Sequence, residues 1–315
     1  MKSKSLLLLC GMAIILIGVT ATLTMCIAQS PDKEDTEFKK SLNEDVLQFD
    51  HLDQYIHDIE LPESLDFCGE AVPLDRFYVR ESLERELLVN SYLHASTMLL
   101  LKRTTRWFPV ITPIMKANNL PDDFKYLAMI ESALTNAVSP SKAVGFWQFL
   151  EGTGKDYKLE IDNKEVDMRY NQELETKAAC QYLNDSYNKF GSWTLAAAAF
   201  NCGNGKMSKT ITEQKVNSYY DMLLPNETER YVYRILALKL ITENPEKYGF
   251  HISDEGWYQP LQYETITVTE SIPDLVDFAL EHGTTYKMLR YYNPWLRGKS
   301  LTISTGNSYK IKLPK

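Results

Sequence analysis

The feature that most constrains the fold is a series of helix-forming segments that fills residues 80–250. Apolar residues recur there at helical spacing, and short breaks containing Pro, Gly or Asn separate the segments. Because short connections bring successive helices together, the sequence predicts an all-α domain. The expected helices span 80–116, 123–134, 173–190, 193–201 and 227–243.

The pattern changes after Gln259. Apolar residues alternate with polar ones at 266–268 and again at 309–313, which is typical of strands. Two short helical segments, 272–282 and 285–292, lie between these strands. The tail therefore predicts a strand–helix–helix–strand module, and the chain as a whole is expected to be mainly α with a small C-terminal α+β module.

Length and charge divide the chain into parts. Its 315 residues suit about two folded domains, and its net charge of −8 argues against a protein that tracks nucleic-acid phosphates. Residues 29–75 hold 14 acidic side chains against 3 lysines, so we interpret them as a solvated tether. The expected parts are 1–28, a signal peptide or membrane anchor; 29–75, the acidic tether; 76–255, the helical domain; and 259–315, the α+β module.

The first residues have the pattern of an export signal. Two lysines precede an apolar run, and no charged residue follows until Asp32. Cleavage after Ala28 fits this pattern, but the uncharged stretch 5–31 also exceeds the roughly 20 apolar residues that span a bilayer. Lipidation at Cys26 is a third reading, because the residues before it resemble a bacterial lipoprotein signal. Export is expected in every case.

Neither a metal nor a cofactor is expected. Beyond the leader the chain has Cys68, Cys180 and Cys202, with no Cys-x-x-Cys pair, and its five histidines form no His-x-x-x-His pair. We interpret the cysteines as small apolar side chains, a reading that leaves room for one disulfide without requiring it.

Glu131 is the candidate catalytic residue, because it interrupts an otherwise apolar helical segment, 127–134. Burying an ionised carboxylate is unfavourable, so its pKa should rise if the site is closed. A raised pKa is what a general acid needs near neutral pH. A single Glu on a helix is nevertheless more often a surface residue, so Glu131 needs support from its neighbours.

That support comes from four short motifs. They are Glu131-Ser132, Gly145-Phe146-Trp147-Gln148, Ala199-Phe200-Asn201-Cys202-Gly203 and Glu227-Thr228-Glu229-Arg230-Tyr231-Val232. In this order they resemble the catalytic domain of soluble-lytic-transglycosylase (SLT) type enzymes, closest to the membrane-bound lytic murein transglycosylase D branch. Two departures stand out: Phe200 replaces the usual Tyr, and residues after Gln148 lack the usual Met-Pro.

The resemblance implies a lysozyme-like α domain that cleaves the MurNAc–GlcNAc β-1,4 bond of peptidoglycan without a cofactor. Glu131 would protonate the leaving oxygen and then deprotonate the C6 hydroxyl, which closes a 1,6-anhydro ring. The positions implied for substrate binding are Ser132, Gln148, Asn201 and Tyr231.

The same resemblance implies a partner and a location. The partner is the peptidoglycan glycan strand, with no nucleic acid. The location is the bacterial cell envelope, on the periplasmic side, with membrane attachment through residues 5–31 or a lipidated Cys26 under two of the readings above.

The tail resembles a degenerate LysM module. The matching parts include 272–276, 283–285 and 309–314, whereas Thr269-Glu270-Ser271 replaces the usual Gly-Asp-Thr. LysM modules bind GlcNAc-containing glycans, so this one is expected either to tether glycan or to serve only as a structural module.

Two other functions fit parts of the pattern. A lysozyme-type hydrolase would need a second carboxylate to activate water. The candidates that follow the second motif are Glu151, Glu160, Asp162 and Asp167. A non-catalytic wall-binding protein has no need of an acid at position 131, so the four motifs together favour an enzyme.

Overall fold

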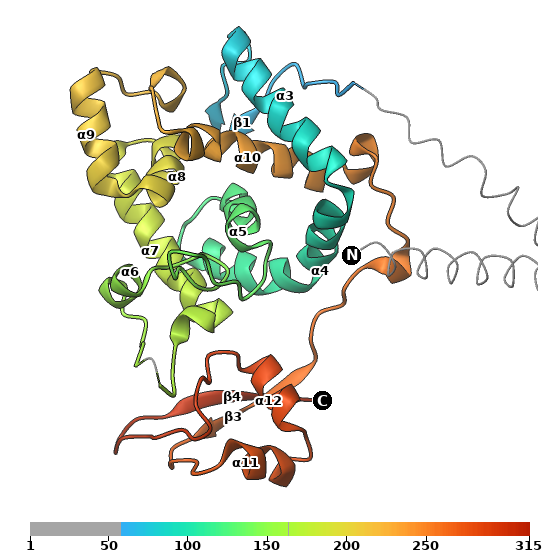
Figure 1. Cartoon of the computed structure of the whole chain (residues 1–315), viewed down its shortest axis with the longest axis vertical. Helices are drawn as coiled ribbons and strands as arrows, with labels where there is room; N and C mark the ends of the chain where they lie inside the picture. Colours follow the sequence, from blue (N-terminus) through green and yellow to red (C-terminus); the bar gives the residue numbers. More distant parts are fainter. Residues whose placement is uncertain (1–57, 163) are drawn as a thin grey trace, which may run out of the picture. The chain divides into compact units, whose positions relative to one another are not determined.

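The computed structural model describes residues 58–162 and 164–315, and helices predominate in them (Figure 1). The predicted leader, with Cys10 and Cys26, and residues 29–57 of the predicted tether lie outside the described residues. None of the described helices is both long enough and apolar enough to cross a membrane. Residues 59–315 form one compact unit.

The helical domain comprises eight of the described α-helices. They are α3 (Phe77–Tyr92), α4 (His94–Ala117), α5 (Lys125–Ser132), α6 (Glu151–Asp156), α7 (Gln172–Phe190), α8 (Trp193–Cys202), α9 (Asn204–Gln214) and α10 (Asn226–Glu243). The short helix α5 lies among the longer ones (Figure 1) and packs against α4 and α10.

The sequence of α5 explains its central place. Leu127, Ala128 and Met129 are all buried, so most of the helix surface is covered by protein. The helix then ends sharply, because Ala133 and Leu134 both adopt left-handed backbone conformations, with φ of 52° and 54°. This ending places Glu131 in the last turn, where the enclosed helix gives way to a loop.

The structure divides the predicted helix 80–116 in two. The break falls at Leu93, and α4 continues without interruption through Pro109 and Pro113. A proline removes one hydrogen bond, but the packing of a long helix against its neighbours outweighs that loss. A helix that the sequence analysis did not predict, α9, begins directly after Gly203 ends α8.

The packed domain begins earlier than the charge pattern indicates. Residues 66–75, assigned above to the tether, form the short antiparallel pair β1 (Asp66–Phe67) and β2 (Glu70–Ala71). The Phe67 side chain is fully buried, with its ring 5.3 Å from that of Phe124. The Glu70 carboxylate accepts hydrogen bonds from the backbone of Trp193 and Thr194 and so caps the start of α8. The surplus of acidic residues over 29–75 therefore did not reveal that Glu70 has a structural role in the folded domain.

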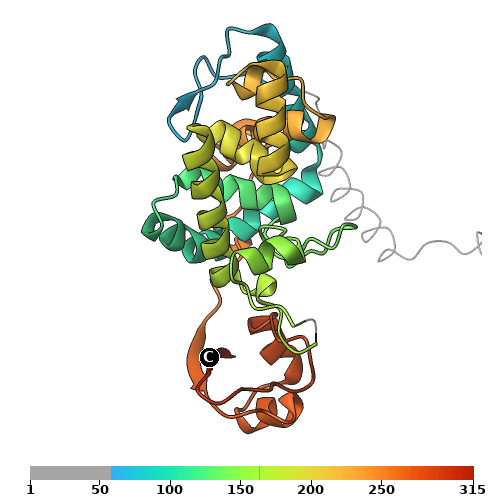
Figure 2. The same ribbon diagram turned by 90° about the vertical axis from the view of Figure 1, so that its left-hand side faces the viewer.

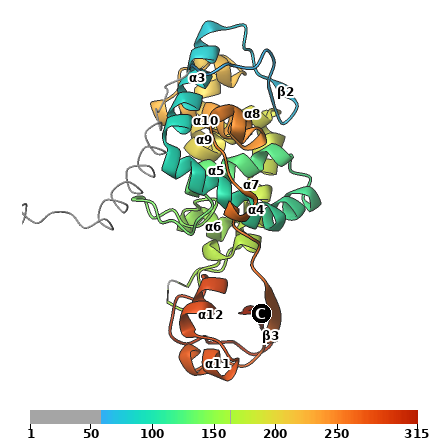
Figure 3. The same cartoon turned by 90° about the vertical axis from the view of Figure 1, so that its right-hand side faces the viewer.

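The tail has the predicted strand–helix–helix–strand order (Figures 2 and 3). It consists of β3 (Tyr263–Val268), α11 (Leu275–Glu281), α12 (Tyr286–Tyr292) and β4 (Tyr309–Pro314). The strands pair in antiparallel register, with Ile266 opposite Ile311. Leu275 and Leu289 are fully buried and bring the two helices onto this pair.

Residues 165–166 connect the helical domain to the C-terminal module. Val166 forms an isolated antiparallel bridge with Leu296, and the Glu165 carbonyl accepts a hydrogen bond from the Arg297 amide. The Glu165 carboxylate accepts two more, from the Ser300 hydroxyl and the Thr302 amide. These contacts bury the main-chain polar groups of two segments against each other.

Candidate active site

A groove of about 680 Å³ runs past the end of α5. Its walls come from α5, the loop 139–150, α8 and the first two turns of α10. Four of the five predicted site residues line it: Glu131, Gln148, Asn201 and Tyr231. Motifs up to 100 residues apart in the sequence therefore meet in one cavity.

Glu131 is partly exposed to the groove and otherwise enclosed. The Tyr231 hydroxyl donates a hydrogen bond to its Oε1 atom. Burial raises the pKa of Glu131 to about 7, while the hydrogen bond from Tyr231 and the positive charge of Arg234 oppose the rise. The predicted rise in pKa is confirmed, and its main cause is desolvation.

Arg234 is a groove residue that the motif pattern did not single out. Its Nη2 atom donates to the Ile130 carbonyl at 3.3 Å, and its charge favours the ionised form of Glu131. The sequence nevertheless indicates that Arg234 lies near the site. Tyr231 and Arg234 are three residues apart, and residues at that spacing share a helix face.

Ser132 does not line the groove. Its side chain is only 7% exposed, and its hydroxyl donates to the Phe146 carbonyl at 2.9 Å. The hydrogen bond joins the first motif to the second. Ser132 therefore positions the loop that carries Gln148, and the structure gives it no route to a ligand in the groove.

Glu175, from α7, stabilises the same loop by accepting hydrogen bonds from its main chain. Its two carboxylate oxygens accept hydrogen bonds from the amides of Phe146 and Trp147, both at 2.8 Å. A Cβ atom at Gly145 would lie 2.4 Å from Glu175 Oε1, and Gly145 has a φ of 88°, so only glycine fits there. Burial raises the pKa of Glu175 well above its usual value, while the two amide bonds work against that rise.

No pattern in the sequence predicts this role of Glu175. Glu175 occupies the first turn of α7, where an acidic residue commonly serves only to complement the helix dipole. Its partners lie 28 and 29 residues away, and no periodicity in α7 points to them.

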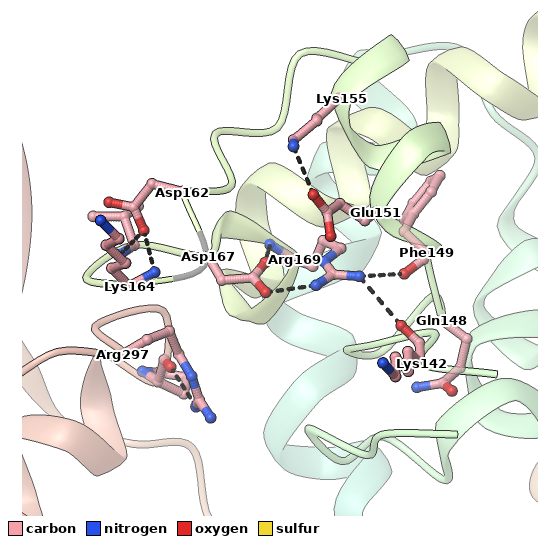
Figure 4. A network of polar contacts seen from close by, with 12 residues as sticks. Lys142, Gln148, Phe149, Glu151, Lys155, Asp162, Lys164, Asp167, Arg169 and Arg297 are labelled. Carbon is pink, nitrogen blue, oxygen red and sulfur yellow. Dashed lines mark hydrogen bonds and ion pairs between the residues drawn. The ribbon is translucent and has the colours of Figure 1, made fainter. Parts of the chain in front are cut away.

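Arg169 is a third support for the loop, as Figure 4 shows. Its guanidinium forms a buried ion pair with Asp167 at 2.7 Å and donates to the carbonyls of Phe149 and Lys142. Arginine suits this place because its planar fork bonds several acceptors at once.

Gln148 and Asn201 are held in place within the groove. Gln148 uses its amide nitrogen on the carbonyls of Ala137 and Gly145, which leaves the amide oxygen for a ligand. Asn201 accepts from the Thr228 hydroxyl at 2.8 Å and donates to Glu227 at 3.3 Å. Both amides are therefore oriented before any ligand binds.

The four carboxylates proposed for a hydrolase lie elsewhere. None of them is among the groove-lining residues. Glu151 pairs with Lys155, Asp167 pairs with Arg169, Asp162 accepts three backbone amides of its own turn, and Glu160 accepts from the Tyr309 hydroxyl. Besides Glu131, the carboxylate that does line the groove is Glu227.

The cysteines in the described part of the chain, Cys68, Cys180 and Cys202, are free thiols. Over the same residues, the side chains form no group of three or more His, Cys, Asp or Glu that could hold a metal ion. Cys202 lines the groove, and burial raises its pKa.

Replacing Glu175 with Gln should destabilise the helical domain by about 1–3 kcal/mol, because an amide offers one acceptor oxygen where two buried N–H groups need partners. Denaturant unfolding of both proteins measures the difference. Glu81→Gln, at an exposed position on α3, is the control and should change stability by less than about 0.5 kcal/mol. Equal effects of the two substitutions would contradict the role given to Glu175.

Two segments of the chain match known domain families. Residues 109–223 match the transglycosylase SLT domain, and residues 264–315 match the soluble lytic transglycosylase C-terminal LysM-like domain. Both segments contain the features described above: the first holds Glu131, Gln148 and Asn201, and the second holds the strand pair β3–β4.

Similar whole proteins are also known. The membrane-bound lytic murein transglycosylase D of Escherichia coli K12 is 29% identical over 245 residues, which cover 75% of this chain and 52% of that protein. The protein of the same name from Escherichia coli O6:H1 matches to the same extent. This chain thus spans about half the length of the curated relatives it matches.

A solved structure of an inactive mutant of the lytic transglycosylase Slt from Pseudomonas aeruginosa is 16% identical, with a TM-score of 0.36, over 57% of this chain and 35% of that one. The two family matches and the fold agree with each other. Residues 109–223 therefore correspond to a transglycosylase SLT domain, and residues 264–315 correspond to a C-terminal LysM-like domain of the soluble lytic transglycosylase type.

Proposed function

We propose that this protein is a peptidoglycan lytic transglycosylase that cleaves the MurNAc–GlcNAc β-1,4 bond and leaves a 1,6-anhydro-MurNAc end. One observation carries the proposal: a carboxyl group with a pKa of about 7 lies in a groove large enough for sugar rings. The matching SLT domain supports the same reaction class.

The first step uses Glu131 as an acid. Near neutral pH a large fraction of its carboxyl groups is protonated, so a proton is available for the glycosidic oxygen. As that C1–O bond breaks, both bonding electrons leave with the oxygen, which takes the proton. The substrate's N-acetyl group stabilises the positive charge that develops at C1, so no second carboxylate is required.

The second step uses the same group as a base. Glu131 is now ionised, and the Tyr231 hydroxyl and the Arg234 charge both favour that form. It removes the proton of the C6 hydroxyl, whose oxygen attacks C1 and closes the anhydro ring. The proton returns to Glu131, no water is consumed, and the enzyme regains its starting state.

A lysozyme-type hydrolase remains the alternative, and Glu227 is the observation that favours it. This carboxylate lines the same groove and raises the pKa of Glu131 by its charge. It also accepts a hydrogen bond from Asn201, which fits an equally simple role in orienting that amide. The two roles predict different products.

The domain roles and location extend the proposal. Residues 66–255 form the transglycosylase domain, ten residues longer at its start than the charge pattern predicted, and residues 259–315 form a module that contacts glycan strands of the same wall. The protein acts in the bacterial cell envelope on the periplasmic side. Residues 5–31 attach it to a membrane if the leader stays uncleaved, and the lipid on Cys26 does so if that residue is lipidated.

Mass spectrometry of the sugar products tests the reaction. Purified peptidoglycan incubated with the protein should yield non-reducible anhydro-muropeptides, each one water lighter than the hydrolytic product. Glu131→Gln should lower the rate by about 100- to 10,000-fold, because an amide cannot supply the proton. Glu227→Gln should still yield anhydro products.

Two other results would assign a different function to the protein. Reducing-end products that disappear with Glu227→Gln would identify a hydrolase. Intact binding of wall material without any product would identify a binding protein and remove the catalytic role of Glu131.

The pH dependence of kcat/KM should follow the protonation of Glu131. Because the first step needs the acid form, kcat/KM should fall as pH rises through about 7. Tyr231→Phe removes a hydrogen bond that favours the ionised form, so the pKa of Glu131 should rise and the fall should move to higher pH. Tyr233→Phe, on the same helix but outside the groove, should leave the midpoint unchanged. A midpoint that does not move with Tyr231→Phe would contradict the assignment.

A further inference from the structure

A second cavity of about 370 Å³ is lined in part by the loop that follows α5. Leu134, Thr135 and Asn136 of this loop line it, together with α4 and the α12 region of the C-terminal module. The reaction proposed above uses none of its side chains.

Three arginines line this cavity, and no Asp or Glu does. The Arg103 guanidinium donates to the Ala133 carbonyl. Arg106 donates to the Gln259 carbonyl and the Tyr291 hydroxyl. All these acceptors are neutral, so the positive charge is not compensated.

Arg290 adds a third positive charge that the cavity lining does not compensate. It donates through Nη1 to the Tyr286 hydroxyl and the Gly298 carbonyl, which are also neutral. Its Nε–H group is buried and has no hydrogen-bond partner. A buried donor without an acceptor is unfavourable, and an incoming anion would relieve it.

Other arginines of this chain show the contrast. Arg76 pairs with Asp221, Arg169 with Asp167, and Arg230 with Glu86. Guanidinium groups prefer such forked contacts with carboxylates. Arg103, Arg106 and Arg290 have no carboxylate among the residues that line the cavity. They therefore match a ligand that carries carboxylates of its own.

The remaining lining argues for a peptide. Trp107, Tyr258 and Tyr291 supply aromatic surface, and the Arg106 guanidinium lies 5.2 Å from the centre of the Tyr258 ring. The exposed Asn136 side chain offers an amide donor and acceptor. A peptide combines apolar side chains, amide groups and carboxylates in the same arrangement.

The distance to the reacting bond is also suitable. Leu134 is three residues from Glu131, so their Cα atoms lie at most about 11 Å apart. A stem peptide of about four residues reaches roughly 13 Å when extended. An extended stem peptide is therefore long enough to span the separation between Glu131 and Leu134.

We propose that the cavity bounded by Arg103, Arg106 and Arg290 binds the carboxylates of a peptidoglycan stem peptide. The proposal rests on the proposed function, because it takes the glycan in the groove to be peptidoglycan. It assigns the junction between the SLT domain and the LysM-like module a role in choosing strands that still carry their stems.

Calorimetric titration of the purified full-length protein tests the site. The probe is the free wall tripeptide, alanyl-γ-glutamyl-diaminopimelate, compared with the same peptide after amidation of its carboxylates. The acidic peptide should bind, and the amidated one should bind at least tenfold more weakly. Higher salt should weaken the first interaction because charges carry it.

Variants locate the binding. Arg106→Gln with Arg290→Gln should weaken tripeptide binding at least tenfold, whereas Arg80→Gln, an exposed arginine on α3, should not change it. If the double variant does not fold, Arg290→Gln alone, in the C-terminal module, is measured in its place. The same variants should lose any preference for stem-bearing over stem-free glycan strands.

Four outcomes decide the matter. Tripeptide binding that needs both the carboxylates and the arginines supports the proposal. Absence of binding overturns it, and so does equal binding of the amidated peptide. Equally effective competition by citrate or inorganic phosphate also overturns it, because the site would then accept any anion.

The titration needs no cleavage, so it separates two failures. Tripeptide binding without anhydro products would reject the proposed reaction and keep the site. Anhydro products without tripeptide binding would reject the site alone.

Discussion

The hydrogen bond between Tyr231 and Glu131 joins the two helices, α5 and α10, on which the groove depends. Burying an ionised carboxylate at the end of an enclosed helix is unfavourable in free energy unless hydrogen-bond donors or positive charges surround it. Tyr231 and Arg234 supply enough stabilisation to keep the pKa near 7, where both protonation states are accessible, and burial prevents it from falling further. A residue that must act first as an acid and then as a base needs this balance.

The groove is completed by a loop that has little regular structure of its own. Residues 142–149 are held by Ser132 from α5, by Glu175 from α7 and by Arg169 through two carbonyls. Each support satisfies main-chain groups that would otherwise be unpaired inside the protein. The same arrangement explains the glycine at position 145, since a side chain there would displace Glu175.

The sequence identified the elements with strong local signals and missed those set by distant contacts. Most of the helices and the strand pair follow from periodicity, and the raised pKa of Glu131 follows from one charge in an apolar segment, whereas α6 and α9 were not predicted. The family resemblance assigned Ser132 to the substrate, yet its hydroxyl donates to a carbonyl 14 residues away. Glu175 and Arg169 carry no local signal, because their partners are specified only once the chain is folded.

The central claim is that Glu131 changes its protonation state near neutral pH, and a direct titration of its side-chain carboxyl tests it. Carbon-13 NMR of glutamate-labelled protein follows that signal with pH, and its absence from the Glu131→Gln spectrum assigns it. We expect a midpoint near 7, raised by burial. A midpoint near 4.5, the ordinary value for a glutamate, would contradict the claim and leave the groove without its acid.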